Sequence, residues 1–365
     1  MYIVVFTSFL AILLTYLESK RKIVGGMKWG FIFLAFLGCI HYDYGNDYMA
    51  YYGIYKNVVR YPFDLGAVLS GDSFKEPGWA ILCYLFKNLG GFFMMVAVLN
   101  IIQNVLIYKT IKRYVEKKWW PISVLVYTCF SSLYLLSFSM MRQFLVMAIF
   151  FGIWPLIEKR KSVLAAFILL LCTTVHSSAL VLLPFAFLGY VPIRRSKWWA
   201  WAFILFYLAI WFGGSFINEV FSMFMGIEQF GEYGETYGDS TTKATFGVGF
   251  LINQIPFILS LYYLLNDSHQ KSQSDKALIC LSILSFIIIP FASIVPLVGR
   301  IGMYFATYQM IAIPRIYGEV KNVSLRYAVM FVLIFMTLYD YFYFFKSPVF
   351  YQKYDTFKTI FSEIL

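Results

Sequence analysis

Long apolar segments recur along almost the whole chain, and they restrict its fold more than any other feature. A segment of about 20 apolar residues is long enough to cross a lipid bilayer as a helix. In lipid, backbone polar groups need partners within the protein, which favours helices over irregular structure. Hydrophobic residues make up 61% of the 365 residues and charged residues only 13%, against roughly half and a quarter in soluble domains. The sequence therefore predicts an all-α, polytopic integral membrane protein, with a single transmembrane domain over residues 1–365.

About twelve transmembrane helices are predicted, some of them short, amphipathic or re-entrant. The predicted segments are 1–17, 29–42, 91–110, 119–138, 142–157, 162–175, 176–191, 198–214, 245–265, 277–297, 300–316 and 327–345. Large loops are predicted outside, at about 43–90 and 215–244. The pair 162–191 has too few residues for two full α-helical crossings of a core about 30 Å thick. A shortened or re-entrant hairpin is therefore predicted, with His176 at its tip inside an outward-facing cavity.

The distribution of charge sets the predicted orientation. The net charge of +11 arises from short basic clusters between apolar segments, not from one basic face, so nucleic acid is excluded as a partner. The clusters "ESKRKIVGGMK", "KTIKRYVEKK", "EKRKS" and "IRRSK" fall in alternate loops, as the positive-inside rule expects of cytoplasmic loops. The N-terminus is then outside. The first apolar segment has "KRK" after it and no basic residue before it, so a retained span is expected instead of a cleaved signal peptide.

No metal site and no cofactor is predicted. The five cysteines lie within apolar segments without the spacing of metal ligands, and we expect buried, unpaired thiols. The sequence has no P-loop, no Asp-x-Asp pattern for a metal-bound nucleotide sugar and no zinc-protease helix.

Polar residues gather on the predicted outer side. The stretch "HYDYGNDYMAYYGIY", residues 41–55, contains Asp43 and Asp47, which would share one face of a helix. Arg142 and Arg300 lie at outer ends of spans, against the charge bias, and such arginines usually have an anionic partner. Each of these residues also has a structural explanation. The arginines could reach lipid headgroups or form salt bridges, the aspartates could cap a helix, and the tyrosines could form an interfacial aromatic belt.

Together these groups suit the chemistry of a lipid-diphosphate glycan. A guanidinium group can donate two parallel hydrogen bonds to two oxygens of one phosphate, and it needs no metal to do so. A carboxylate or an imidazole can accept the proton of an attacking hydroxyl, and His176, with an ordinary pKa near 6.5, suits that task at neutral pH. Tyrosines can stack on sugar rings and bind their hydroxyls.

Several stretches resemble one known family. "IHYDYGNDYMAYYGIY", "KEPGWAILCYL", "SMMRQFLVMAI", "VHSSALVLLPF" and "VGRIGMYF" occur in the order found in EpsG-type proteins. These are bacterial Wzy-like polymerases of O-antigen, capsule and exopolysaccharide. The resemblance is strongest from about residue 38 to 190 and returns near residue 300. It implies a metal-independent glycosyltransferase in the bacterial cytoplasmic membrane, which joins undecaprenyl-diphosphate-linked repeat units with its active site facing outside. The glycan substrate and the bilayer are the implied partners, with a chain-length regulator and a flippase of the same pathway.

The resemblance also implies roles for individual residues. The catalytic candidates are His176, Asp47 and Glu76. The diphosphate-binding candidates are Arg142, Arg300 and Gln143. The sugar-binding candidates are His41, Asp43, Tyr48, Tyr52 and Tyr304. The family often has arginine at the position of His41, so a phosphate-binding role is not expected there.

Three other functions remain open from the sequence. An O-antigen ligase, or another glycosyltransferase that uses lipid-linked sugars, would differ only in its acceptor. A flippase or transporter of lipid-linked glycans would be expected to have inverted repeats and polar groups near the membrane midplane, and neither pattern is found. A membrane acyltransferase with His176 as base would usually take its acyl donor from the cytosol, which the predicted outer location disfavours.

Overall fold

The computed structural model describes residues 1–193, 196–213, 248–266, 272–294 and 296–364. The described chain forms two compact units. The first combines Met1–Tyr190 with Tyr317–Leu365, and the second is Val191–Ile316. The predicted outer loop 215–244 lies outside the described residues, and the single transmembrane domain stays a prediction.

The first unit contains most of the described helices. Those before residue 130 are α1 (Tyr2–Ser19), α2 (Gly26–Ile40), α3 (Tyr48–Val58), α4 (Leu65–Leu69), α5 (Pro77–Lys87), α6 (Gly91–Tyr114), the short 3-10 helix η1 (Lys117–Trp119) and α7 (Trp120–Cys129). Those that follow are the π-helical turn η2 (Ser131–Leu135), α8 (Met141–Gly152), α9 (Trp154–Glu158), α10 (Ser162–Val175), the 3-10 helix η3 (Ser177–Tyr190), α18 (Val323–Lys346), α19 (Tyr351–Tyr354) and α20 (Phe361–Ile364).

Four helical segments among the described residues are long and apolar enough to cross a membrane. They are Tyr2–Ser19, Gly91–Tyr114, Met141–Glu158 and Val323–Lys346. Five shorter apolar helices are Gly26–Ile40, Ser162–Val175, Ser177–Tyr190, Ser196–Phe212 and Gln254–Leu265. This pattern is that of a helical membrane protein, whereas the number of twelve crossings and the outer cavity stay predictions.

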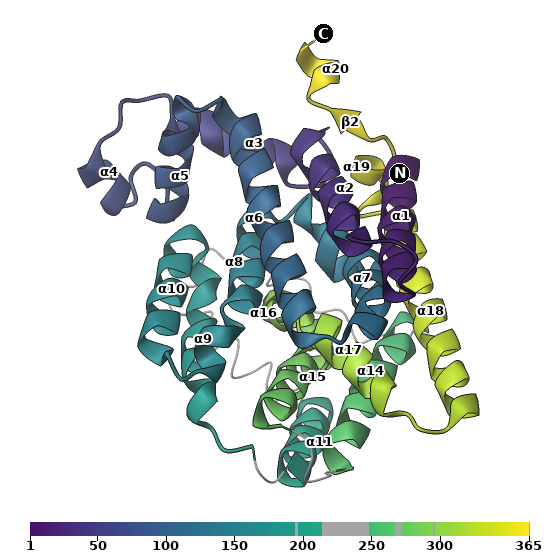
Figure 1. Cartoon of the computed structure of the whole chain (residues 1–365). Coiled ribbons are helices and arrows are strands. Elements are labelled where there is room, and N and C mark those ends of the chain that lie inside the picture. Colours follow the sequence, from purple (N-terminus) through teal and green to yellow (C-terminus); the bar gives the residue numbers. More distant parts are fainter. Residues whose placement is uncertain (194–195, 214–247, 267–271, 295, 365) are drawn as a thin grey trace. The chain divides into compact units, whose positions relative to one another are not determined.

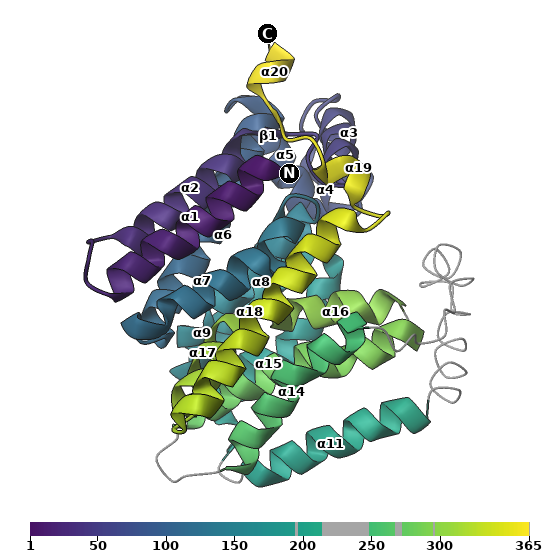
Figure 2. The same ribbon diagram turned by 90° about the vertical axis from the view of Figure 1, so that its right-hand side faces the viewer.

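Helices α1, α2, α6 and α7 pack together in the first unit, and α1 lies beside α2 in both views (Figures 1 and 2). The ring of Phe31 in α2 stacks on Tyr127 in α7, with centroids 5.4 Å apart. The Tyr127 hydroxyl donates a hydrogen bond of 3.0 Å to the Asn104 side chain in α6. The aromatic contact and the buried hydrogen bond thus join α2, α6 and α7.

The predicted span 119–138 is not one continuous helix. Helix α7 ends at Cys129, because Phe130 has an extended backbone with φ −79° and ψ 122°. The Ser131 N–H, freed by this break, donates a hydrogen bond of 2.8 Å to the carboxylate of Asp340 in α18. If the predicted span 119–138 lies in the membrane, its freed backbone groups need such a partner, and Asp340 supplies one from far along the sequence.

The segment 162–191 forms a hairpin, as its length suggested, in which α10 packs against η3. Its second arm is a 3-10 helix of 14 residues, far longer than is usual for this type. The larger rise of a 3-10 helix, about 2.0 Å per residue, lets this arm reach roughly 28 Å. An α-helix of the same length would reach only about 21 Å. His176 lies at the turn between the arms.

The C-terminal segment, residues 347–364, is fastened to the stretch that follows α2. Strands β1 (His41–Tyr42) and β2 (Lys358–Thr359) form a short antiparallel pair, with His41 opposite Thr359. This pair is the one departure from the predicted all-α fold in the described chain. The Gly45 N–H donates to the Lys353 carbonyl oxygen at 3.4 Å, and the Asn46 side chain donates to the Val349 carbonyl at 3.0 Å.

The second unit contains the helices between the hairpin and α18. They are α11 (Ser196–Phe212), α14 (Val248–Leu265), α15 (Gln273–Ile294), α16 (Pro296–Ala306) and the first part of α17 (Gln309–Glu319). The predicted span 300–316 is thus divided between two helices. The hydroxyl of Tyr207 in α11 donates to the Gln254 side chain in α14 at 2.6 Å.

Candidate active site

The sequence "EPGW", residues 76–79, builds the start of α5 and one side of a polar cluster. Glu76 has an extended backbone, which the following Pro77 favours, and its carbonyl accepts hydrogen bonds from the N–H groups of Trp79 and Ala80. Its side chain makes no capping bond to the helix. The carboxylate is therefore available to residues outside α5.

Gly78 allows α5 to approach the turn of the hairpin. A Cβ atom at this position would lie 2.2 Å from the Thr174 hydroxyl oxygen and 3.0 Å from the Thr174 backbone carbon. The first distance is shorter than Cβ atoms show in real structures, and the second would require the Thr174 backbone to shift by a few tenths of an ångström. Since Thr174 lies two residues before His176, this contact brings the hairpin turn against Glu76.

The Glu76 carboxylate is buried, with its side chain 7% exposed, and has partners on both oxygens. Oε2 is ion-paired with the Arg142 guanidinium. Oε1 accepts the Ser177 N–H at 2.9 Å and lies 3.3 Å from Nδ1 of His176. We call Glu76, Arg142 and His176 the carboxylate cluster. Glu76 directly precedes α5, Arg142 is in α8 and His176 lies at the turn between α10 and η3, all in the first unit.

Arg142 lies among aromatic rings at the start of α8. Its guanidinium carbon is 5.3 Å from the ring centre of Tyr51, 5.2 Å from that of Phe74 and 5.9 Å from that of Trp79. Cation–π contacts of this kind gain strength when they are shielded from water, and the arginine side chain is only 18% exposed. Arg142 Nη1 bonds Glu76, whereas Nε is buried without a hydrogen-bond partner among the described residues. The guanidinium therefore retains donor capacity.

Tyr51 completes this side of the cluster. Burial raises the pKa of its hydroxyl above the ordinary value, and the nearby Arg142 charge opposes that shift. Tyr51 is on α3, whose first turn follows Asp47. The Asp47 carbonyl accepts the Tyr51 N–H at 2.9 Å. The Asp47 side chain is exposed at the start of this helix.

The other predicted residues of the first unit lie outside the carboxylate cluster. Asp43 is paired with two lysines of the C-terminal segment, Lys353 at 2.9 Å and Lys358 at 3.8 Å. His41 is fully buried and its Nδ1 lies 2.7 Å from the Gly38 carbonyl oxygen. Tyr48 is also fully buried, with its ring against the edge of His41. In this conformation neither Tyr48 nor His41 presents a surface to a sugar.

Tyr52 and Gln143 have different surroundings. Tyr52 is half-buried, its ring stacked on Phe93 at 5.9 Å, with the Lys56 ammonium 4.2 Å from its centre. Gln143 follows Arg142 in α8 and is 1% exposed. Arg300 and Tyr304 belong to α16 in the second unit, where Tyr304 is fully buried and Arg300 is half-buried.

Sequence reasoning did not assign roles to Tyr51, Phe74, Trp79 or Ser177, which all contact the cluster. Trp79 lies in "EPGW" and Ser177 in "HSSAL", two stretches that carry the family resemblance. These motifs therefore pointed to both positions, although the residue types alone did not. Within the described ranges, no group of three or more His, Cys, Asp and Glu side chains could hold a metal ion.

The apolar helices and the buried arginine–carboxylate–histidine contact define a multi-pass helical membrane protein with a polar site built from separate helices. The model of the EpsG family matches residues 29–356, nearly the whole chain. The chain belongs to the EpsG family. This membership indicates a polysaccharide polymerase in general terms. Neither a curated protein nor a solved structure matches the chain.

Proposed function

We propose that the protein polymerises undecaprenyl-diphosphate-linked oligosaccharide repeat units at the outer face of the bacterial cytoplasmic membrane. The observation that carries this proposal is the contact of one buried carboxylate, Glu76, with both Arg142 and His176. Transfer of a glycan from a lipid diphosphate needs a proton acceptor for the attacking hydroxyl and a cation for the leaving group. The carboxylate cluster contains one group suited to each task.

His176 is the proposed base, and Glu76 orients it. An ionised carboxylate can only accept hydrogen bonds, so Nδ1 of His176 carries the hydrogen in its 3.3 Å contact with Glu76. In a neutral imidazole, Nε2 then has the lone pair that accepts a proton. The same carboxylate–histidine arrangement fixes the tautomer and raises the basicity of histidines elsewhere. Asp47 is proposed to orient the acceptor hydroxyl.

In the proposed step, the acceptor hydroxyl oxygen attacks the anomeric carbon of the donor glycan. The carbon–oxygen bond to the diphosphate breaks, the hydroxyl proton passes to His176, and undecaprenyl diphosphate leaves with the bond electrons. Arg142 stabilises the charge that develops on the diphosphate through guanidinium N–H groups other than the Nη1 that bonds Glu76. Gln143 is proposed as a further diphosphate contact, and the diphosphate role of Arg300, which belongs to the second unit, stays a prediction from the sequence. If the displacement is single and assisted by one base, it inverts the anomeric configuration.

The test is polymer synthesis by purified variants supplied with lipid-linked repeat units. Arg142→Ala should abolish synthesis, and Arg142→Lys should recover little, because lysine keeps the charge but loses the planar fork. Losing one transition-state donor typically lowers the rate about 10²- to 10³-fold. Arg60→Ala is the control, since Arg60 is an exposed arginine of the predicted outer loop 43–90, outside the cluster. If the Arg142→Ala variant made as much polymer as the wild type, Arg142 would not be the group that stabilises the leaving diphosphate.

A further inference from the structure

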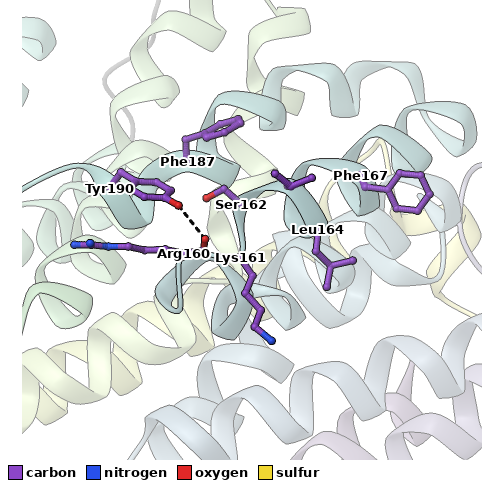
Figure 3. A pocket seen from close by; sticks show the side chains of 8 residues that line it. Arg160, Lys161, Ser162, Leu164, Phe167, Phe187 and Tyr190 are labelled. Carbon is purple, nitrogen blue, oxygen red and sulfur yellow. Dashed lines mark hydrogen bonds between the residues drawn. The ribbon is translucent and has the colours of Figure 1, made fainter.

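A separate pocket lies at the opposite end of the hairpin from His176. It has a volume of about 920 Å³ and is open on one side. It is lined by the turn before α10, the first turns of α10 and the end of η3 (Figure 3). The surrounding loop, "EKRKS", is one of those predicted to face the cytoplasm. The pocket shares no residue with the carboxylate cluster.

The turn that forms the rim of this pocket is held in a defined shape. The Arg160 side chain donates through Nε to the Gly189 carbonyl at 3.2 Å. The Tyr190 hydroxyl donates in return to the Arg160 carbonyl at 3.1 Å, as Figure 3 shows. A Cβ atom at Gly189 would lie 2.1 Å from the Ile157 carbonyl oxygen, so only glycine permits this approach. The Arg160 side chain is thereby held at the pocket rim, where the exposed Lys161 side chain also lines the pocket.

The polar end of the pocket has unused hydrogen-bond donors. Ser162 lines the pocket and is only 4% exposed, and its hydroxyl has no hydrogen-bond partner among the described residues. A buried hydroxyl without a partner is unfavourable and therefore rare. Ser162 also begins α10, where Lys161 makes no side-chain cap, and the first N–H groups of a helix lack acceptors within it. These donors and the positive end of the helix dipole favour an anion.

The remaining walls of the pocket are apolar and exposed. Leu164, Phe167 and Phe187 line it and are 46%, 56% and 51% exposed. In a membrane protein such surfaces face lipid chains. An anionic group bound at Ser162 and Lys161 would therefore be attached to a hydrocarbon chain lying along these rings.

We propose that this pocket binds one anionic phospholipid, with its phosphate at Lys161 and Ser162 and an acyl chain against Phe167 and Phe187. The charge complementarity of the rim, the buried Ser162 hydroxyl and the apolar wall carry the proposal. Its location in the inner leaflet rests on the predicted topology, whereas binding itself does not. The site is independent of the proposed polymerase chemistry.

The test is native mass spectrometry of delipidated full-length protein, titrated with dioleoyl phosphatidylglycerol or dioleoyl phosphatidylcholine. The wild type should bind one phosphatidylglycerol more tightly than phosphatidylcholine. Lys161→Ala should weaken that binding about fivefold, which is the typical effect of one basic residue near an anionic lipid surface. Ser162→Ala should weaken it about tenfold, through loss of a hydrogen bond to a charged group.

Lys112→Ala is the matched control, because Lys112 is an exposed lysine at the end of α6 outside this pocket. It should leave the affinity for phosphatidylglycerol unchanged. Ser162→Ala removes a hydroxyl without a described partner, so it should fold and unfold thermally like the wild type. Equal binding of the two lipids, or affinities of both pocket variants within about twofold of the wild type, would overturn the proposal.

Discussion

The buried pair of Glu76 and Arg142 can be tested by a double-mutant cycle that separates folding from catalysis. Removing one partner of a buried ion pair lowers the free energy of unfolding by about 3–5 kcal/mol, because the other charge stays buried without a counterion. We expect the lower end, about 3 kcal/mol, for Arg142→Met, since the Glu76 carboxylate keeps the Ser177 N–H and the His176 contact. Glu76→Gln should cost a similar amount, because Arg142 is only 18% exposed. The double variant should cost far less than the sum, since replacing both partners by neutral groups is often nearly neutral.

Thermal unfolding in detergent can be followed with a thiol-reactive fluorophore. Four of the five cysteines, Cys83, Cys129, Cys172 and Cys280, are buried in the folded protein, so their thiols report unfolding. Burial raises the pKa of the Cys83 thiol to about 12. At roughly 2–4 °C per kcal/mol, each single variant should melt about 6–12 °C below the wild type. The double variant should recover most of this loss and still make no polymer. Additive losses of stability in the double variant would refute the coupled pair, and normal synthesis by Glu76→Gln would refute its role in orienting His176.

Three further predictions address the topology, the base and the C-terminal contacts. In intact cells, a cysteine introduced at Asp72 should react with a membrane-impermeant thiol reagent, and one introduced at Ser272 should not. If the cysteine at Ser272 were labelled, the predicted orientation would be wrong. If His176 is the base, the wild-type rate should fall as the pH is lowered and the imidazole becomes protonated, because imidazolium cannot accept a proton. His176→Gln should be nearly inactive at every pH, and a variant that keeps most of its rate and its loss of rate at low pH would transfer the role to Asp47. Lys353→Ala should lower the free energy of unfolding by at most about 1 kcal/mol and leave polymer synthesis intact, as expected for loss of a partly exposed ion pair. If Asp43→Ala abolished polymer synthesis and Lys353→Ala did not, Asp43 would bind sugar instead of anchoring the C-terminal segment.

The sequence predicted the helical membrane fold because apolar length and loop charge are local properties. It predicted the hairpin at 162–191 for the same reason, from a count of residues against membrane thickness. It did not predict the break after Cys129, because the partner that makes the break tolerable, Asp340, is 209 residues from Ser131. Nor did it predict a long 3-10 helix, since the apolar composition of η3 is equally suited to an α-helix.

The sequence by itself singled out Arg142 and His176, because charged and titratable groups beside apolar segments are costly and need a reason to be there, and it suggested Glu76 through the resemblance to EpsG-type proteins. Only the tertiary structure decided that they meet, although Glu76 is 66 residues from Arg142 and 100 from His176. It also decided that Asp43 pairs with Lys353 and that Tyr48 is buried, since the direction of a side chain depends on what packs around it. A residue's type limits the chemistry it can do, and its neighbours in the fold determine which part of that chemistry is available.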